Sequence, residues 1–127
     1  MLDTKLRAVI KTDNGNFIPY DRYGEPVAGM SWLPLSGERL NGQFECFLLR
    51  MEPGSRSLPH EHTGYEEFLV MDGEFIDYDG TRYGSGDFVS YLPGSMHSSH
   101  TPNGCTLLVM LRGNNRPLSD AEIEANS

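Results

Sequence analysis

Hydrophobic residues along the chain fall into short runs separated by turn residues. The clearest runs are Phe44 to Met51, Tyr65 to Met71 and Cys105 to Leu111, bordered by turns such as Pro53-Gly54 and Asn103-Gly104. Closely spaced runs of this kind are typical of strands in sandwiches and barrels. Because the first run is almost continuously apolar, we expect a central strand buried on both faces. The pattern predicts an all-β fold.

Shorter segments complete the prediction. Further strands are expected over Leu6 to Lys11, Asn16 to Tyr20, Ser31 to Leu35, Glu74 to Tyr78, Asp87 to Tyr91 and Met96 to Thr101. Asn14-Gly15 predicts a turn between the first two, and Asp72-Gly73 predicts a hairpin. Near the C-terminus, Ser119 and Glu122 have the spacing of a capping box, which predicts a short helix.

Length and charge restrict the function classes. We expect one domain over residues 1–127, with the barrel at about 30–111, N-terminal strands in 5–29 and a short tail at 112–127. A net charge of -8 disfavours nucleic-acid and membrane partners. The first five residues do not resemble a signal peptide, so we expect a cytoplasmic protein in which Cys46 and Cys105 stay reduced.

A candidate metal site begins with two histidines. His60 and His62 are two residues apart, so on a strand they face the same side. Beyond the Thr63-Gly64 bend, Glu66 and Glu67 face opposite sides of the next strand. Even spacing from His62 favours Glu66, although a bulge at Gly64 would promote Glu67. Imidazole with one carboxylate suits iron, zinc, nickel or manganese better than calcium or magnesium.

A further ligand is expected from the second half of the chain. His97 follows the Pro93-Gly94-Ser95 turn and can reach the same site from the opposite side of a barrel. His100, three residues later, faces away on a regular strand. We therefore predict a site for one divalent ion on His60, His62, Glu66 and His97. For Tyr65, Glu67 and His100 we expect surface, packing or ligand-supporting roles instead of ligation.

The segment carrying these residues resembles the first cupin motif, which is Gly, five residues, His-x-His, three or four residues, Glu, six residues, Gly. The matching positions are Gly54, His60, His62, Glu66 and Gly73. The interval to Gly73 selects Glu66 over Glu67, in agreement with strand parity.

The second cupin motif is matched by Gly86, Gly94 and His97, although Leu92 stands where the motif has proline and Pro93 follows it. Over about residues 30–111 the chain most resembles the cupin domain of ChrR-type anti-sigma factors and small oxygenase-like cupins. The resemblance implies an RmlC-like jelly roll, the double-stranded β-helix, often a homodimer with metal in the barrel mouth. The zinc-binding His-x-x-x-Cys-x-x-Cys signature of anti-sigma relatives is not in this sequence, so we expect no direct sigma-factor binding.

These expectations suggest several functions. Open coordination positions favour chemistry on a small molecule, and with iron(II) the site would suit a dioxygenase acting on an enolisable substrate. The alternatives are a non-catalytic sensory or regulatory metal-binding module and a metal-dependent isomerase, for which no general base is visible beyond the ligands. Arginines that bind a substrate carboxylate and aromatic residues that line a pocket are one interpretation, although solvated arginines and core aromatics are the commoner outcome. These residues are Arg50, Arg56, Arg82, Tyr20, Tyr23, Trp32, Phe44, Phe75, Tyr78, Phe88 and Tyr91.

Overall fold

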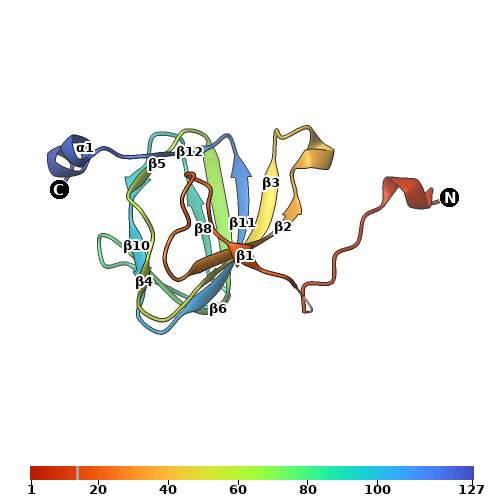
Figure 1. Ribbon diagram of the computed structural model, residues 1–127, viewed down its shortest axis with the longest axis horizontal. Coiled ribbons are helices and arrows are strands. Elements are labelled where there is room, and N and C mark those ends of the chain that lie inside the picture. The colour runs from red at the N-terminus through yellow and green to blue at the C-terminus, as the bar shows by residue number, and fades with distance from the viewer. Residues whose placement is uncertain (14) are drawn as a thin grey trace.

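The computed structural model describes residues 1–13 and 15–127, and these residues form a jelly-roll β-barrel with a helix at its C-terminal end (Figure 1). Twelve strands occur in the described residues: β1 Ile18–Pro19, β2 Met30–Ser36, β3 Glu45–Met51, β4 Ser55–Arg56, β5 His60–His62, β6 Tyr65–Asp77, β7 Arg82–Gly84, β8 Phe88–Tyr91, β9 Met96–His97, β10 Ser99–Thr101, β11 Cys105–Arg112 and β12 Asn115–Pro117. Two short 3-10 helices span Thr4–Leu6 and Glu38–Leu40, and α1 spans Asp120–Ala125.

Two antiparallel sheets make up the barrel. The larger follows the order β1-β2-β3-β11-β6-β10-β4, with β7 and β8 also paired to β6. The smaller has the order β12-β5-β9. Its pairing aligns His60 on β5 with His97 on β9, while His62 aligns with Asn115 on β12. The smaller sheet therefore carries all three histidines of the predicted metal site.

The inner face of the larger sheet is arranged in rows across neighbouring strands. One row joins Glu45 on β3, Leu111 on β11, Glu66 on β6 and Tyr91 on β8. The adjacent row consists of Phe47, Val109, Phe68 and Val89, of which the first three belong to the buried core. The core thus begins directly beneath the row that holds Glu66, and apolar packing fixes the position of that carboxylate.

Strand β3 lies between β2 and β11, as expected of a central strand, but it is not buried on both faces. Phe47, Leu49 and Met51 are buried, whereas Cys46 and Leu48 are half-buried and Arg50 is exposed. The apolar run therefore belongs to a strand with one core face and one partly open apolar face.

The hairpin predicted at Asp72-Gly73 is wrong, because β6 continues through both residues to Asp77. Gly73 has a φ of +83°, and a Cβ added there would lie 2.1 Å from the carbonyl oxygen of Gly104. Glycine at this position therefore permits a close approach of two chain segments within a continuing strand. The chain turns back only at Asp79-Gly80, where β7 begins to pair with β6.

The strand predicted over Leu6 to Lys11 is also wrong. Residues Thr4–Leu6 form a 3-10 turn, and the following residues extend away from the barrel without pairing to any described strand (Figure 1). A strand needs a hydrogen-bonded neighbour, which hydrophobic alternation alone does not supply. Of the segment Asn16 to Tyr20, only β1 pairs with β2. The predicted Asn14-Gly15 turn includes Asn14, which lies outside the described residues.

Two differences concern the C-terminal third. The strand predicted over Met96 to Thr101 is broken at Ser98 into β9 and β10, which belong to different sheets. The predicted tail contributes β12 to the barrel. Helix α1 is confirmed, with both hydrogen bonds of the capping box between Ser119 and Glu122. Within the described residues, no helix is long and apolar enough to cross a membrane.

Candidate metal centre

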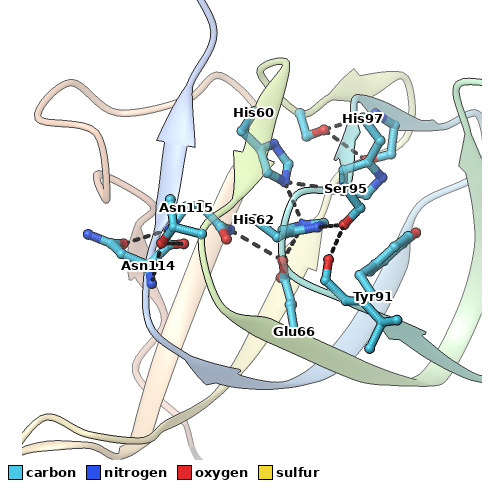
Figure 2. Close-up of polar contacts among 12 residues, drawn as sticks. His60, His62, Glu66, Tyr91, Ser95, His97, Asn114 and Asn115 are labelled. Atoms are coloured by element: carbon cyan, nitrogen blue, oxygen red, sulfur yellow. Dashed lines mark hydrogen bonds and ion pairs between the residues drawn. The ribbon is translucent and has the colours of Figure 1, made fainter.

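Three histidine side chains converge at one point inside the barrel (Figure 2). His60, His62 and His97 are only 7%, 0% and 8% exposed. The Nε2 atom of His60 lies 3.2 Å from that of His62 and 3.1 Å from that of His97. Two nitrogens bound at about 2.1 Å to one ion with ordinary coordination angles lie roughly 3.0–3.4 Å apart, so the observed spacing suits a shared transition-metal ion.

The other ring nitrogen of each histidine already has a partner. His60 Nδ1 lies 2.6 Å from the Leu58 carbonyl oxygen, and His97 Nδ1 lies 2.8 Å from Asp77 Oδ1. His62 Nδ1 lies 2.7 Å from Ser95 Oγ, whose own hydrogen is donated to the Leu92 carbonyl oxygen. Because these oxygens accept, each Nδ1 donates, and each neutral ring carries its proton on Nδ1.

This tautomer leaves the three Nε2 atoms without hydrogens, so their lone pairs face one another. A hydrogen bond cannot form between two such atoms unless one ring is protonated. Burial and the neighbouring His97 lower the pKa of His60 to about 4, so His60 does not readily supply that proton near neutral pH. The donor set therefore fits a metal ion, which would accept all three lone pairs.

Glu66 adds a carboxylate to the histidine cluster. Its Oε2 lies 2.5 Å from His62 Nε2 and accepts a hydrogen bond from Asn115 Nδ2 at 3.3 Å. Burial alone would raise the pKa of Glu66, but its interaction with His62 outweighs that effect and the pKa is lowered. The Glu66 carboxylate thus contacts His62 Nε2 from β6, and the two atoms would share one ion, or one proton when no ion is bound. In Figure 2 Asn115 lies on the β12 side of Glu66.

Asp77 holds His97 in place. Its carboxylate accepts hydrogen bonds from His97 Nδ1, from the Tyr91 hydroxyl at 2.6 Å and from the Tyr83 hydroxyl at 3.2 Å. Burial opposes ionisation, but the hydrogen bonds from His97 and Tyr91 prevail and lower the Asp77 pKa to about 2. Burial, together with this carboxylate, raises the pKa of Tyr91, which remains a hydroxyl donor. Asp77 is therefore ionised near neutral pH and anchors one imidazole.

The structure separates the other sequence candidates from this cluster. His100 is half-buried on β10 opposite Ile76 and Arg56. Tyr65 and Glu67 lie on the outer face, where they line a surface groove. Of the arginines, Arg50 lies over the Phe17 ring and Arg82 pairs with Glu74. None of these residues is in the group that the described residues bring together as potential metal ligands.

Two of the aromatic candidates do border the histidines. The Tyr91 ring centroid lies 4.8 Å from that of His62 and 4.6 Å from that of His97. The Tyr23 ring centroid lies 6.4 Å from that of His60. Tyr20, Trp32 and Phe75 pack in the core cluster or against it, as ordinary for barrel aromatics.

Sequence reasoning missed several residues around the site. Asp77, Ser95, Asn115 and the Leu58 carbonyl reach it through strand pairing and turns that no local pattern specifies. For Asp77 the available signal was a carboxylate directly after the apolar pair Phe75-Ile76. Asp77 and Phe75 are two residues apart, so on a strand their side chains point to the same face. Asn115 has no comparable local signal.

Comparison with known proteins places this geometry in a family. The model of the ChrR cupin-like domain matches residues 5–114. Auxin-binding protein 1 of Arabidopsis thaliana is 33% identical over 70 residues, which are 54% of this chain and 34% of that protein. The alignment thus spans about a third of that curated relative's length.

Among solved structures, an acetylacetone dioxygenase from Acinetobacter johnsonii aligns with a TM-score of 0.79 at 15% identity, covering 91% of this chain and 80% of that chain. Rhodobacter sphaeroides SigE in complex with the anti-sigma ChrR aligns with a TM-score of 0.65 at 21% identity, covering 80% of this chain and 51% of that chain. Identities this low show a shared fold. Since the family model covers most of the sequence, the chain belongs to the ChrR cupin-like domain family.

Proposed function

We propose that the protein is a metal-dependent dioxygenase of the iron(II) type that acts on a small enolisable ketone. His60, His62, Glu66 and His97 would hold the ion. The observation that carries the proposal is the convergence of three Nε2 lone pairs on one point, with the Glu66 carboxylate in contact with that of His62. Four protein ligands leave two positions open on a six-coordinate ion, which suits substrate binding rather than a sealed structural site.

The surrounding residues would keep the ligands oriented. When bound, an iron(II) ion supplies Lewis acidity toward the two oxygens of an enolised diketone or hydroxyketone, and electrons for dioxygen. The Leu58 carbonyl, Ser95 and Asp77 hold the three imidazoles with Nε2 directed inward. The Tyr91 ring packs against His62 and His97, and the buried Phe68 ring packs against Tyr91, so aromatic rings border this side of the site.

A non-catalytic metal-dependent sensor is the second candidate. The fold shared with ChrR, solved in complex with SigE, favours it, because the same domain occurs there in a regulatory protein. Fold similarity does not separate a catalytic from a sensory site. The resemblance of the fold to an acetylacetone dioxygenase and the open donor set together support the catalytic proposal.

Zinc, nickel and manganese are alternative ions for the same donors.

We also propose a cytoplasmic homodimer. Support for the dimer comes from the outer face of β3 and β11, where the apolar side chains of Cys46, Leu48 and Met110 are only half-buried. Support for the reducing compartment comes from Cys46 and Cys105, which are both free thiols.

Oxygen uptake tests the catalytic proposal. Protein loaded with iron(II) under nitrogen is mixed with oxygenated buffer and a series of β-diketones and hydroxyacetophenones. We expect substrate-dependent oxygen consumption that is lost in His97→Ala and retained in His100→Ala, with zinc-loaded protein as the redox-inert control. Iron-loaded protein that binds a diketone yet consumes no oxygen with any compound would contradict the dioxygenase and favour the sensor.

A further inference from the structure

An apolar row crosses the outer face of the larger sheet, on the opposite side of β6 from Glu66. The strand pairing aligns Leu48 on β3, Leu108 on β11, Leu69 on β6 and Phe88 on β8. The three leucines are only half-buried, and Phe88 is 56% exposed. Single exposed apolar residues are common on protein surfaces, but a continuous row across four strands indicates a binding surface.

A groove of 310 Å³ adjoins this row. Its lining includes Phe44, Tyr65, Leu92 and Met110, together with the charged residues Glu67 and Arg112. Tyr65 and Leu92 are 52% and 67% exposed, so they project at the rim of the groove. Glu67 and Met110 face each other in the row next to the leucines. The apolar row and the groove therefore form one surface, the outer patch.

The groove holds two charges of opposite sign. The pairing of β6 with β11 places Glu67 opposite Met110 and Tyr65 opposite Arg112, so the two charged residues are diagonal neighbours, roughly 7–8 Å apart. Within the described part of the chain, neither of them has an ion-pair partner. The Arg112 guanidinium carbon lies 5.6 Å from the Phe44 ring centroid, which keeps this charge beside the groove.

A second copy of the chain fits these features better than other occupants. In a two-fold interface the same patch is present on both sides, so a patch with one positive and one negative charge can pair with itself. Aromatic and methionine side chains with few charges are the composition of interface centres. The net charge of -8 disfavours an anionic membrane or a nucleic acid on this surface.

We infer that two copies associate through the outer patch about a two-fold axis, with Glu67 of each copy paired with Arg112 of the partner subunit. The inference rests on the homodimer proposed above and names its interface. Sheets packed face to face lie about 10 Å apart, a gap that a glutamate and an arginine side chain span together. Tyr65 and Leu92 at the rim are placed to enter the facing groove of the other copy.

The outer patch and the metal centre share strands but not faces. Because side chains alternate along a strand, Glu66 points into the barrel while Tyr65 and Glu67 point outward. On β11, the buried Leu111 likewise lies between the outward residues Met110 and Arg112. Substitutions at Glu67 and Arg112 therefore test association separately from metal chemistry.

Charge reversal at either position tests this interface. Sedimentation velocity of the full chain over a series of protein concentrations gives the dissociation constant of the dimer. Glu67→Arg opposes two positive charges at each pair, and Arg112→Glu opposes two negative charges. We expect either variant alone to raise the dissociation constant by at least about thirtyfold, since repulsion replaces attraction at two symmetric places.

Matched controls change the net charge equally outside the patch. Glu74 and Arg82 form an exposed pair within one chain. Glu74→Arg and Arg82→Glu alter the net charge by the same amounts as the two test variants. Each should leave the dissociation constant within about twofold of the native value, because exposed pairs contribute little.

Mixing the two test variants separates pairing between copies from a loss of folding. In a dimer of one Glu67→Arg chain and one Arg112→Glu chain, both pairs again join opposite charges. We expect the equimolar mixture to dimerise within about threefold of the native dissociation constant. A variant that failed to fold could not restore association in this way.

The outcomes separate the interface from the homodimer and from the dioxygenase. A native dimer whose dissociation constant is unchanged by both charge reversals would overturn the interface and leave a homodimer through another face. Variants that stay monomeric when mixed would overturn the pairing of Glu67 with Arg112. Native protein that sediments as a monomer up to about 1 mM would contradict both the interface and the homodimer. Oxygen uptake tests the dioxygenase independently of all three results.

Discussion

The metal centre and the buried polar residues around Arg22 differ in how completely the protein satisfies their hydrogen-bonding atoms. Every histidine Nδ1 has a protein partner, so the three rings are fixed before any ion binds. Around Arg22, two donors and one acceptor are buried without partners in the described residues. The difference teaches that the protein itself prearranges the geometry of the histidines, whereas protein partners do not satisfy every buried polar atom around Arg22.

Removing a ligand should have the largest effect on this prearranged part. His62→Ala deletes a fully buried imidazole that contacts both His60 and Glu66. We expect metal affinity, measured by competition with a chelator, to fall by more than about a hundredfold. This loss exceeds the decrease in metal affinity that usually follows when a ligand loses its hydrogen-bond partner. His100→Ala, in the matched control, should leave affinity nearly unchanged. Equal losses in the two variants would show that the ligands are misassigned.

Acid should destabilise the metal-free protein through His60. The pKa of this buried imidazole is lowered from 6.5 to about 4. Between these two values the unfolded chain binds a proton on His60 that the folded protein does not bind. Stability is therefore fully present above pH 6.5 and decreases as the pH falls toward 4, by about 3 kcal/mol in total. Urea unfolding of chelator-treated protein at pH 7 and pH 4 measures the change.

His60→Gln should remove most of this pH dependence. The lowered pKa values of Glu66 and Asp77 add a further loss that begins near the unfolded value of 4.5 for Glu66 and continues to about pH 2 for Asp77. Unfolding free energies that are the same at pH 7 and pH 4 in the native sequence would contradict a buried neutral His60.

Loss of a supporting carboxylate should have an intermediate effect. Asp77→Asn keeps the size of the side chain but removes the charge that orients His97. Metal affinity should fall by about thirtyfold, within the range known for the hydrogen-bond partners of metal ligands. Asp79→Asn, in the turn two residues later, is the control and should bind metal as the native protein does. An unaffected Asp77→Asn variant would mean that His97 is oriented by packing alone.

The smallest effect is expected at the exposed edge of the smaller sheet. Arg116 on β12 pairs with Glu61, which lies between the two histidines of β5, and with Glu122 in α1. Because exposed ion pairs contribute little, Arg116→Ala should change metal affinity by less than about twofold in the same chelator competition. A loss as large as that of Asp77→Asn would show that β12 depends on these charges to hold the ligand strand.

Local pattern was sufficient for the alternation of His60 and His62, for the capping box of α1, and for placing Glu66, not Glu67, on the face of β6 that meets His62. The structure brings His60, His62 and His97 together, places Glu66 against His62 and leaves His100 outside this group. These features depend on spacing along one strand or turn, which sequence displays directly.

Features that depend on distant pairing were not predictable in this way. Gly73 resembles a turn residue, but its close approach to Gly104 makes it part of a continuous strand. Leu6 to Lys11 alternates like a strand but pairs with no described strand. Asp77 becomes part of the site only because β6 and β9, which are distant in sequence, meet inside the barrel.

Metal content tests the central claim most directly. Protein purified without a histidine tag or added metal is analysed for transition metals, then stripped with chelator and titrated with iron(II), nickel and zinc alongside His62→Ala. The account predicts one divalent ion per chain at saturation in the native sequence, and strong loss of binding in the variant. Native protein that binds no more metal than His62→Ala would contradict a metal centre on His60, His62, Glu66 and His97.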